Sequence, residues 1–414
     1  MLTCAAATVG AAVGQYGPSP CGGKPCLPKW IPTYNMSQST IFMPCNYSGQ
    51  YDAAVAAKFG IVDFDWSNEK NLWVNDSPMT CMERLISQAR VIKDINPDTK
   101  IWVYRESVAA QPWYTDVRAK LLDPASQSWF LKFDPAKNGS YHVPRCDSNF
   151  HPPRCSDFYH DQVQTPDYPK GDGSCKEPCD CGVPCGRYLW DTRNPDLVDW
   201  LVNDHLTGNT SVGNPLIDGI FLDDEWSTSG GAAENCNLAD CEHDMGLASK
   251  DVADITAGWG EMMKRTQQRV LNLGGFDWRM FQPGAGTCDG PPFQKAKCAE
   301  YVRAQCQPNA SLQHSAMMYG LGQGCKLVLG PDGDPLDFEQ HLASFLVIRG
   351  PYAWLGWSWV GCGVVPPRPA GMDTDYGEPM SHCTEGTPGI FTREWTKATA
   401  TIDCNKWEGT VTLK

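Results

Sequence analysis

Short apolar segments that are rich in β-forming residues alternate with helical patterns along most of this chain. Between the strand-like segments, apolar residues recur three or four positions apart, as in the long segment 251–275. The strand-like segments include STIFMPC, GIVDFDW, KIWVYRE, IDGIFLDD and YAWLGWSW, at residues 39–45, 60–66, 100–106, 217–224 and 352–359. This alternation is typical of a parallel sheet covered by helices, and about eight strands favour an α/β fold of the (β/α)8 TIM-barrel type.

The rest of the chain fits around such a barrel, which we expect to span residues 21–390. No Gly-x-Gly-x-x-Gly fingerprint or P-loop follows a strand-like segment, which argues against the common nucleotide-binding folds. The tail, residues 391–414, alternates and is rich in threonine, so it predicts a pair of β-strands packed on the barrel. Residues 1–20 are small and apolar with no basic residue, so they are either a signal-like segment or an N-terminal arm.

Cysteine content indicates the compartment. Twenty cysteines are too many for a reduced cytosolic enzyme of this size, so we expect disulfides and a secreted, extracellular protein. Residues 134–188 show no helical period and are rich in cysteine, so they predict a disulfide-rich insertion after the third strand. The cluster CKEPCDCGVPC in this insertion is spaced too tightly for the usual zinc pattern, which favours disulfides over a metal.

Asn-x-Ser/Thr sequons support the same compartment. Six of them occur, and none has proline in the middle position. Together with the cysteines, they predict a glycoprotein that carries N-linked glycans. The six asparagines are Asn35, Asn46, Asn75, Asn138, Asn209 and Asn309.

Charge and hydropathy limit the partners. The formal net charge is −14 and the pI is about 5.0, which argues against nucleic acids and anionic membranes, because both need basic patches. No apolar run reaches the roughly 18–20 residues that a membrane span needs. We expect no cofactor and no metal, although calcium in Asp-rich loops is left open.

Polar and aromatic residues gather where the predicted strands end. In TIM barrels, the carboxyl ends of the strands form the active-site face. Tryptophan and tyrosine rings stack on sugars, and carboxylate and guanidinium groups bind sugar hydroxyls. We therefore predict a carbohydrate site lined by Asp63, Asp65, Trp66, Tyr104, Arg105, Asp191, Arg193, Trp226, Tyr319 and Trp357.

The segment DGIFLDDEW ends an apolar strand in three consecutive acids. Side chains alternate along a strand, so Asp223 shares a face with Phe221 and is expected to point into the barrel mouth. The next two acids would then lie at the rim. Two carboxylates at one glycosidic bond are the usual apparatus of glycoside hydrolysis. The candidate catalytic residues are therefore Asp223, Asp224 and Glu225.

Each of these residues also has a structural interpretation. A terminal aspartate can cap the next segment or pair with an arginine, here Arg105 or Arg193. Asp191 lies just before a predicted helix, where capping competes with sugar binding. Trp357 fits a hydrophobic core as well as a sugar platform.

Two motifs carry a resemblance to a known family. DGIFLDD resembles the Asp-Gly-x-aromatic-x-Asp strand of TIM-barrel glycoside hydrolases, in which the last aspartate often serves as nucleophile; that position is Asp223 here. WDTRNPDLVDWL followed by DGIFLDDEW resembles a group of glycoside hydrolase-like barrels, and longer segments look like secreted hypothetical proteins of algae and related protists. The resemblance implies a TIM barrel but assigns no partner acid.

Two functions remain open from the sequence. The first is a secreted glycoside hydrolase that acts on an extracellular polysaccharide or glycan, with Asp223 as nucleophile or charge stabiliser. The second is a non-enzymatic structural or carbohydrate-binding glycoprotein of an extracellular matrix, wall or filament, which could form a homo-oligomer. The distance between the carboxylates and the burial of Asp223 would distinguish the two.

Overall fold

The computed structural model describes about two thirds of the chain. Glu225, residues 1–20 and all of the predicted insertion except Tyr188 lie outside the described part. The described residues are 21–22, 24, 26–30, 33–35, 39–73, 76, 79–131, 188–224, 226, 246–279, 295–310, 316–321, 330–331, 333 and 338–414.

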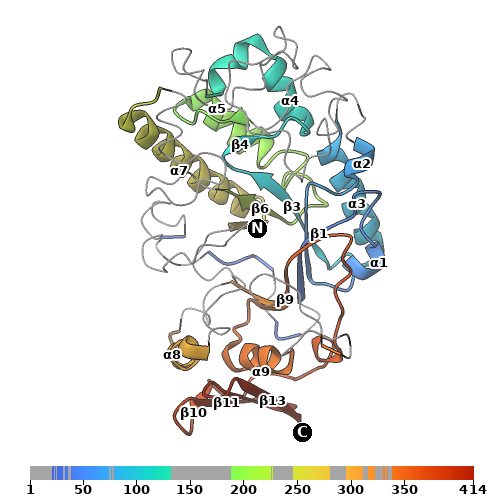
Figure 1. Cartoon of the computed structure of the whole chain (residues 1–414), viewed down its shortest axis with the longest axis vertical. Coiled ribbons are helices and arrows are strands. Elements are labelled where there is room, and N and C mark those ends of the chain that lie inside the picture. Colours follow the sequence, from blue (N-terminus) through green and yellow to red (C-terminus); the bar gives the residue numbers. More distant parts are fainter. Residues whose placement is uncertain are drawn as a thin grey trace.

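Seven strands form one parallel sheet at the centre of the molecule (Figure 1). Their order is β7-β6-β3-β2-β1-β9-β8, and every neighbouring pair is parallel. The described strands do not pair β7 with β8, so the eight-stranded closed barrel stays a prediction, whereas the parallel α/β sheet is confirmed. The strands are β1 Ser39–Cys45, β2 Ile61–Phe64, β3 Lys100–Glu106, β6 Gly219–Asp223, β7 Phe276–Arg279, β8 Met317–Leu321 and β9 Ala353–Cys362.

An aromatic core lies on the inner face of this sheet. The ring of Trp30 lies 6.2 Å from Trp102 of β3, 6.3 Å from Phe276 of β7 and 5.9 Å from Trp354 of β9. These three strands are not neighbours in the sheet, so the sheet must curve for all of them to contact one ring. The hydrophobic core therefore sits inside the curve, as it does in barrel-like folds.

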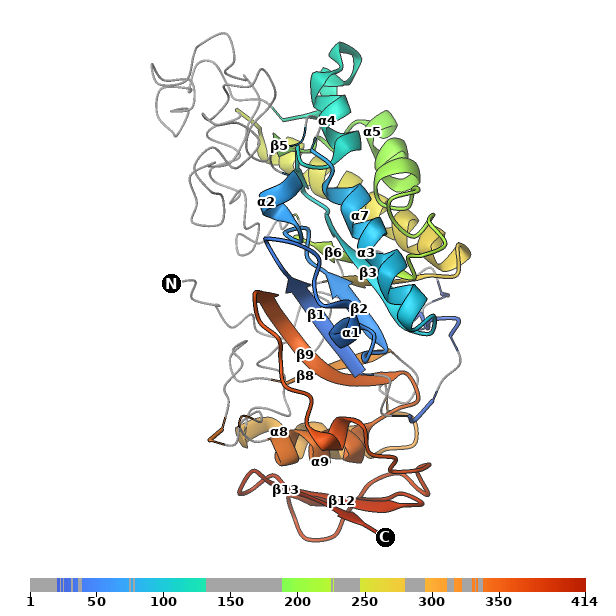
Figure 2. The ribbon, with the colours of Figure 1, turned by 90° about the vertical axis from the view of Figure 1, so that its right-hand side faces the viewer.

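Helices cover the outer side of the sheet, and Figure 2 shows α3, α5 and α7 packed side by side along β3 and β6. Asn194 caps the start of α5, because its side chain accepts hydrogen bonds from the backbone N–H groups of Asp196 and Leu197. The helices are α1 Ala53–Ala56, α2 Lys70–Trp73, α3 Cys81–Ile95, α4 Thr115–Leu122, α5 Pro195–Trp200 with a π-helical turn Leu201–His205, α7 Ser249–Asn272, α8 Lys295–Gln305 and α9 Phe338–Ile348. A short pair, β4 Ala109–Ala110 and β5 Tyr188–Leu189, follows β3.

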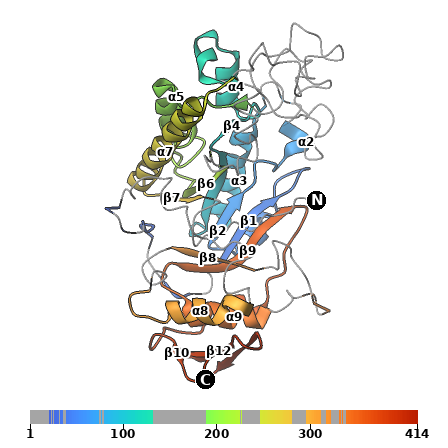
Figure 3. The ribbon, with the colours of Figure 1, turned by 60° about the vertical axis from the view of Figure 1, so that its left-hand side comes forward.

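The tail forms a second, antiparallel sheet with four strands, where the sequence predicts two. They are β10 Thr384–Glu385, β11 Ile390–Glu394, β12 Ala398–Asp403 and β13 Glu408–Leu413. Helices α8 and α9 lie between this sheet and the main sheet (Figure 3). The disulfides Cys298–Cys404 and Cys306–Cys383 connect α8 to the terminal sheet.

Two further disulfides, Cys21–Cys26 and Cys45–Cys362, occur among the described cysteines. They confirm that the chain uses disulfides, as its cysteine content predicts. Cys81 is a buried free thiol. Within the part of the chain that the structure describes, no helix combines the length and apolar character that crossing a membrane requires.

Candidate functional site: a carboxylate cluster at the end of β3 and β6

Glu106 and Asp223 lie side by side at the carboxyl ends of neighbouring strands. The parallel register of β3 and β6 pairs these two residues directly. The predicted alternation is consistent with the contacts, because the Phe221 ring packs on Phe42 and Tyr104 at 5.7 and 6.1 Å. Two residues further along, the carboxylate of Asp223 reaches the Tyr104 hydroxyl on the same inner face.

We call Glu106, Asp223 and Asp224 the carboxylate cluster. One oxygen of each residue lies within 4.8 Å of the others. Their exposed fractions are 0%, 6% and 3%. The structure therefore brings together two of the three predicted catalytic acids, while Glu225 lies outside the described residues.

Tyr104 joins two members of the carboxylate cluster. Its hydroxyl lies 2.7 Å from Oδ2 of Asp223 and 3.2 Å from Oε2 of Glu106. Burial raises the pKa of Tyr104 well above its usual value, and the nearby charges of Asp223, Glu106 and Asp224 raise it further. The phenol is therefore neutral at physiological pH and can donate its proton to a carboxylate.

Glu106 is held by the turn that follows β3. Its Oε1 accepts hydrogen bonds from the backbone N–H groups of Val108 and Ala109 at 3.2 and 3.4 Å. Its Oε2 lies 3.5 Å from Nε2 of Gln111. Donors of this kind favour the ionised carboxylate. Glu106 is not among the predicted site residues, although its position two residues after Tyr104 is the sequence signal that places it on the same face.

Asp224 stands where the chain leaves β6. Its φ of 57° is in the left-handed region, which is uncommon for a residue other than glycine. Its backbone N–H donates to Oδ1 of Asp223 at 3.0 Å, and its carbonyl accepts from the Ser107 hydroxyl at 2.7 Å. Trp259 of α7 donates to the same hydroxyl at 3.0 Å. These contacts hold Asp224 in a conformation that directs it back to the carboxylate cluster.

Two further acids lie near the carboxylate cluster. Asp63 is on β2, and Asp65 follows the end of that strand. Asp63 is 0% exposed, and neither of its carboxyl oxygens has a hydrogen-bond partner among the described residues. Burial, followed by the charges of Asp65 and Asp223, raises the pKa of Asp63 well above its usual value. Asp65 is also buried, and its Oδ1 accepts a hydrogen bond from the Ser67 N–H at 2.7 Å.

The predicted arginines have other contacts. Arg105 donates to the carbonyls of Tyr104 and Thr210 and lies over the Tyr114 ring. Arg193 forms ion pairs with Asp191 and with Asp251, a residue of the first turn of α7. The structure thus brings neither guanidinium group into a contact with the carboxylate cluster.

The predicted aromatic residues divide by burial. Trp226 and Trp357 are buried, and Tyr319 is buried on β8 beside Phe345 of α9. Trp66 keeps part of its surface exposed and stacks on Trp113 at 4.5 Å. Among these residues, Trp66 is therefore the one that keeps surface for a sugar to contact, although the Lys70 ammonium also lies over its ring at 5.1 Å.

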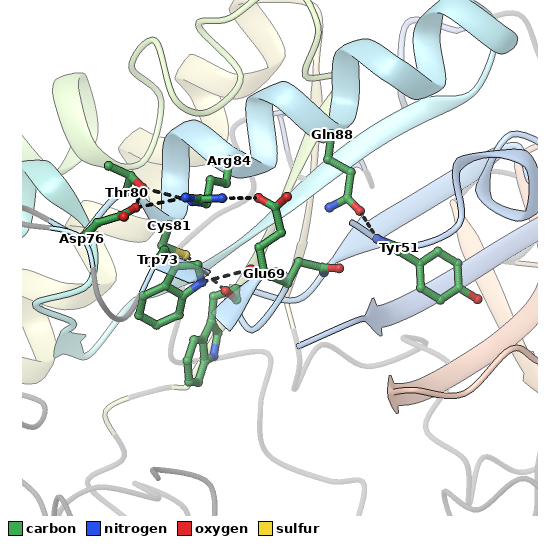
Figure 4. Close-up of polar contacts among 10 residues, drawn as sticks. Tyr51, Glu69, Trp73, Asp76, Thr80, Cys81, Arg84 and Gln88 are labelled. Atoms are coloured by element: carbon green, nitrogen blue, oxygen red, sulfur yellow. Dashed lines mark hydrogen bonds and ion pairs between the residues drawn. The ribbon is translucent and has the colours of Figure 1, made fainter. Parts of the chain in front are cut away.

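A network of ion pairs fixes the segment that carries Trp66 (Figure 4). Arg84 of α3 lies 3.3 Å from Glu69 and 3.2 Å from Asp76. The thiol of Cys81 donates to the Trp66 carbonyl at 3.2 Å. The sequence does not predict this network, because the spacing between residues 69 and 84 gives no sign that they meet.

The predicted glycosylation sites are on accessible surface where they are described. Asn35, Asn209 and Asn309 are exposed and Asn46 is half-buried. Asn75 and Asn138 lie outside the described residues. Exposure is compatible with glycosylation at these positions, which stays a prediction.

Comparisons with protein-family models and with curated proteins found no match. Among solved structures, the chain is similar to the GH36 α-galactosidase AgaA from Geobacillus stearothermophilus, at 9% identity and a TM-score of 0.40, over 87% of this chain and 46% of that one. It is similar to a GH31 dextranase from Flavobacterium johnsoniae, at 13% identity and a TM-score of 0.42, over 86% and 39%. It is also similar to sucrose 6F-phosphate phosphorylase from Thermoanaerobacter thermosaccharolyticum, at 9% identity and a TM-score of 0.45, over 91% of this chain and 95% of that one.

The chain spans less than half the length of the first two of these proteins. Because the three TM-scores are below 0.5, we base the function on the geometry of this chain alone.

Proposed function

We propose that this chain is a secreted glycoside hydrolase-like protein that acts on an extracellular glycan. In this proposal the parallel sheet is part of a (β/α)8 barrel, and the carboxylate cluster is the catalytic centre. The supporting observation is that one oxygen each of Glu106, Asp223 and Asp224 lie within 4.8 Å of one another at the carboxyl ends of adjacent strands. Catalytic groups of α/β barrels occupy this edge.

The hydrogen bonds suggest a role for each acid. Asp223 accepts from the Tyr104 hydroxyl and from a backbone N–H, which favours the ionised form that a nucleophile needs. Glu106 accepts two backbone N–H groups, so it serves as a fixed negative charge beside the cationic transition state. This leaves Asp224 to donate the proton to the leaving oxygen. One oxygen of Asp223 and one of Asp224 lie within 4.8 Å of each other, closer than the roughly 6.5–9.5 Å between the carboxyl groups of inverting enzymes, so we propose a retaining mechanism.

A sugar would contact the residues around the carboxylate cluster. Trp66 offers the partly exposed ring, and Asp65 offers a carboxylate near it. The buried residues Trp226 and Trp357 would shape the site from behind. In this proposal the arginines Arg105 and Arg193 support the structure, since their guanidinium groups contact backbone carbonyls and aspartates.

Hydrolysis of a panel of glycans and p-nitrophenyl glycosides tests the proposal. Asp223→Asn and Asp224→Asn should each lower the rate about 10²–10⁴-fold, because each removes a group that acts on the reacting bond. Asp218→Asn is the matched control, since Asp218 precedes the other end of β6 and pairs with Lys93. Activity that is unchanged in both cluster variants would contradict the assignment, and the anomer released, measured by NMR, checks for retention.

A second candidate function is favoured by the burial of the acids. Exposed fractions of 0% to 6% leave little surface for a sugar to contact. The chain would then be a structural or carbohydrate-binding glycoprotein of a matrix, wall or filament. This candidate predicts no hydrolysis of any glycan in the panel, together with glycan binding or self-association, which light scattering would detect.

A further inference from the structure

Strand β13 forms an edge of the terminal sheet, at one end of the long axis of the molecule (Figure 1). Within the order β10-β11-β12-β13, the described strands give β13 one partner, β12. The opposite edge strand, β10, has two residues, which limits its pairing with another chain. β13 has six residues, Glu408–Leu413, without a proline or a register shift. An edge of this kind is a template for a further extended strand.

The register shows which backbone groups of β13 face away from β12. The N–H of Lys414 donates to the carbonyl of Lys397, which continues the register between β12 and β13 by one pair. Hydrogen-bonded and non-hydrogen-bonded pairs alternate along an antiparallel ladder. Even-numbered residues of β13 therefore bond to β12, and the N–H and C=O groups of Gly409, Val411 and Leu413 point to the outer edge.

These outward groups can pair with the same strand of a second copy. When two β13 strands run antiparallel with Val411 on a two-fold axis, Val411 faces its own counterpart and Gly409 faces Leu413 of the other copy. All of these residues point their backbone groups outward, so each pair can exchange two hydrogen bonds. Between them, Thr410 lies opposite Thr412 as a cross-strand pair. The edge is thus complementary to itself about this axis.

The charges at the two ends of β13 fit the same register. Glu408 lies three residues before Val411 and Lys414 three residues after it, so each Glu408 would face Lys414 of the other copy. Within one chain, Glu408 pairs with Lys406 at 3.8 Å and Lys414 pairs with Glu394 at 2.7 Å, and these side chains are 40% to 67% exposed. Exposed pairs are weak, so both side chains can turn to a new partner. Opposite charges in register favour this arrangement of two copies over others.

Leu413 contributes apolar surface to this edge, since its side chain is 60% exposed. A Cβ atom at Gly409 would lie 2.6 Å from Cα of Gln340, so position 409 faces α9, and Leu413 lies on the same side of the strand. In the antiparallel register Leu413 faces Gly409 of the other copy, which has no side chain. Leu413 would therefore lie beside α9 of the other copy and lose exposed apolar surface, which favours association.

We propose that β13 pairs with β13 of a second copy of this chain, antiparallel about a two-fold axis through Val411. The two four-stranded terminal sheets then form one continuous sheet. Because both copies use the same edge, the pairing closes as a dimer and does not extend into a filament. The carboxylate cluster lies in the main sheet, so the dimer is independent of the proposed hydrolysis.

Light scattering of the full chain, with its disulfides intact, tests the proposal between about 1 µM and about 1 mM, the range in which small interfaces associate. We expect a dimer that dissociates on dilution. Hydrogen exchange identifies the edge. The amides of Val411 and Leu413 should exchange at least about tenfold more slowly in the dimer than in the monomer, whereas those of Thr410 and Thr412, bonded to β12, should be protected in both.

Two substitutions separate the dimer contact from the fold. Val411→Pro removes an outward N–H that β12 does not use, so the monomer should stay folded, with a thermal midpoint close to that of the natural chain, and should not dimerise. Leu413→Ala should weaken dimerisation about threefold to tenfold through lost apolar burial. Val365→Ala is the matched control, since Val365 is 61% exposed and lies outside β13, and it should dimerise as the natural chain does.

Charge exchange tests the register. Glu408→Lys should weaken dimerisation at least about fivefold, because the two-fold axis repeats the loss at both ends of the pairing. The double variant Glu408→Lys/Lys414→Glu should recover part of that loss. Glu261→Lys makes the same change on an exposed residue of α7 and should have no effect.

Three outcomes would overturn the proposal. The first is a natural chain that stays monomeric up to about 1 mM, and the second is assembly into species larger than a dimer. The third is a dimer that persists unchanged in folded Val411→Pro and Glu408→Lys, since another surface would then hold it together. Hydrolysis is measured separately, so a failure of the proposed enzyme and a failure of the dimer give different results.

Discussion

Asp63 is a buried acid whose protonation affects the stability of the folded chain. It lies in register with Trp102, and burial followed by the charges of Asp65 and Asp223 raises its pKa well above the usual value. In the unfolded chain the same carboxyl ionises above about pH 4, whereas in the folded chain it keeps its proton. Folding therefore takes up a proton, so the contribution of Asp63 to stability falls as the pH rises from about 4 towards the pKa of the folded state.

We expect Asp63→Asn to be more stable than the natural chain at pH 7.5 and close to it at pH 4. Asparagine has nearly the same shape and no charge to suppress, so the difference should grow with pH by up to about 1.4 kcal/mol per pH unit. Urea unfolding at the two pH values measures it. Asp116→Asn is the control of opposite sign. Asp116 pairs with His205 at 2.9 Å, so this substitution should lower the free energy of unfolding near neutral pH. A difference for Asp63→Asn that shrinks as the pH rises would show that Asp63 is ionised and paired.

At the residue scale, the sequence predicts which face of a strand a side chain lies on better than it predicts which residues that side chain contacts. Strand alternation places Asp223 on the same face as Phe221, which agrees with the contact between Asp223 and Tyr104. The same rule applied to β3 would have added Glu106. Gln111 could not be predicted, because its contact with Glu106 depends on how the turn after β3 folds back.

Gly409 marks a close contact between β13 and α9. A Cβ atom at this position would lie 2.6 Å from Cα of Gln340 and 2.8 Å from Cβ of Ala343, both in α9. These are rigid helix atoms, so β13 or α9 would have to move. We expect Gly409→Ala to lower the free energy of unfolding by about 1–3 kcal/mol, as overpacking does elsewhere.

Chemical denaturation of Gly409→Ala beside Gly386→Ala measures this effect. Gly386 precedes β11, and a Cβ atom there would meet no atom within 4 Å. Its substitution should therefore leave stability within about 0.5 kcal/mol of the natural chain or raise it slightly. Equal losses in the two variants would mean that the contact with α9 is not what requires glycine at position 409.

At the element scale, hydrophobic pattern places strands well and their pairing poorly. The segments 39–45 and 100–106 are predicted with the bounds that the structure gives to β1 and β3. The number of strands in the tail is harder to predict. Strand β10 has only two residues, Thr384–Glu385, which is too short for an alternating pattern to be recognised. Its four-stranded order depends on pairing between segments, about which alternation along one strand says nothing.

At the scale of the whole molecule, the alternation of strands and helices predicts a parallel sheet, and the structure confirms it. Closure of the sheet is different. A closed barrel requires the first and last strands to meet, and this depends on the tilt and stagger of all strands together. The sheet curves around Trp30, as a sheet that closes into a barrel would, but no local sequence pattern specifies the stagger of its strands.

The disulfide Cys45–Cys362 links the carboxyl ends of β1 and β9, the first and last strands of the main sheet along the chain. Its partners are 317 residues apart, so the bond removes much freedom from the unfolded chain. The chain-entropy relation gives about 6 kcal/mol for such a loop and about 2 kcal/mol for the Cys21–Cys26 loop, whose partners are 5 residues apart. We therefore expect the double variant Cys45→Ala/Cys362→Ala to lose much more stability than Cys21→Ala/Cys26→Ala. Denaturant unfolding of both under non-reducing conditions measures the two losses. Similar losses in the two variants would contradict this expectation. They would mean that the long link acts through local contacts between β1 and β9, and that the pairing of these two strands already keeps them together in the unfolded chain.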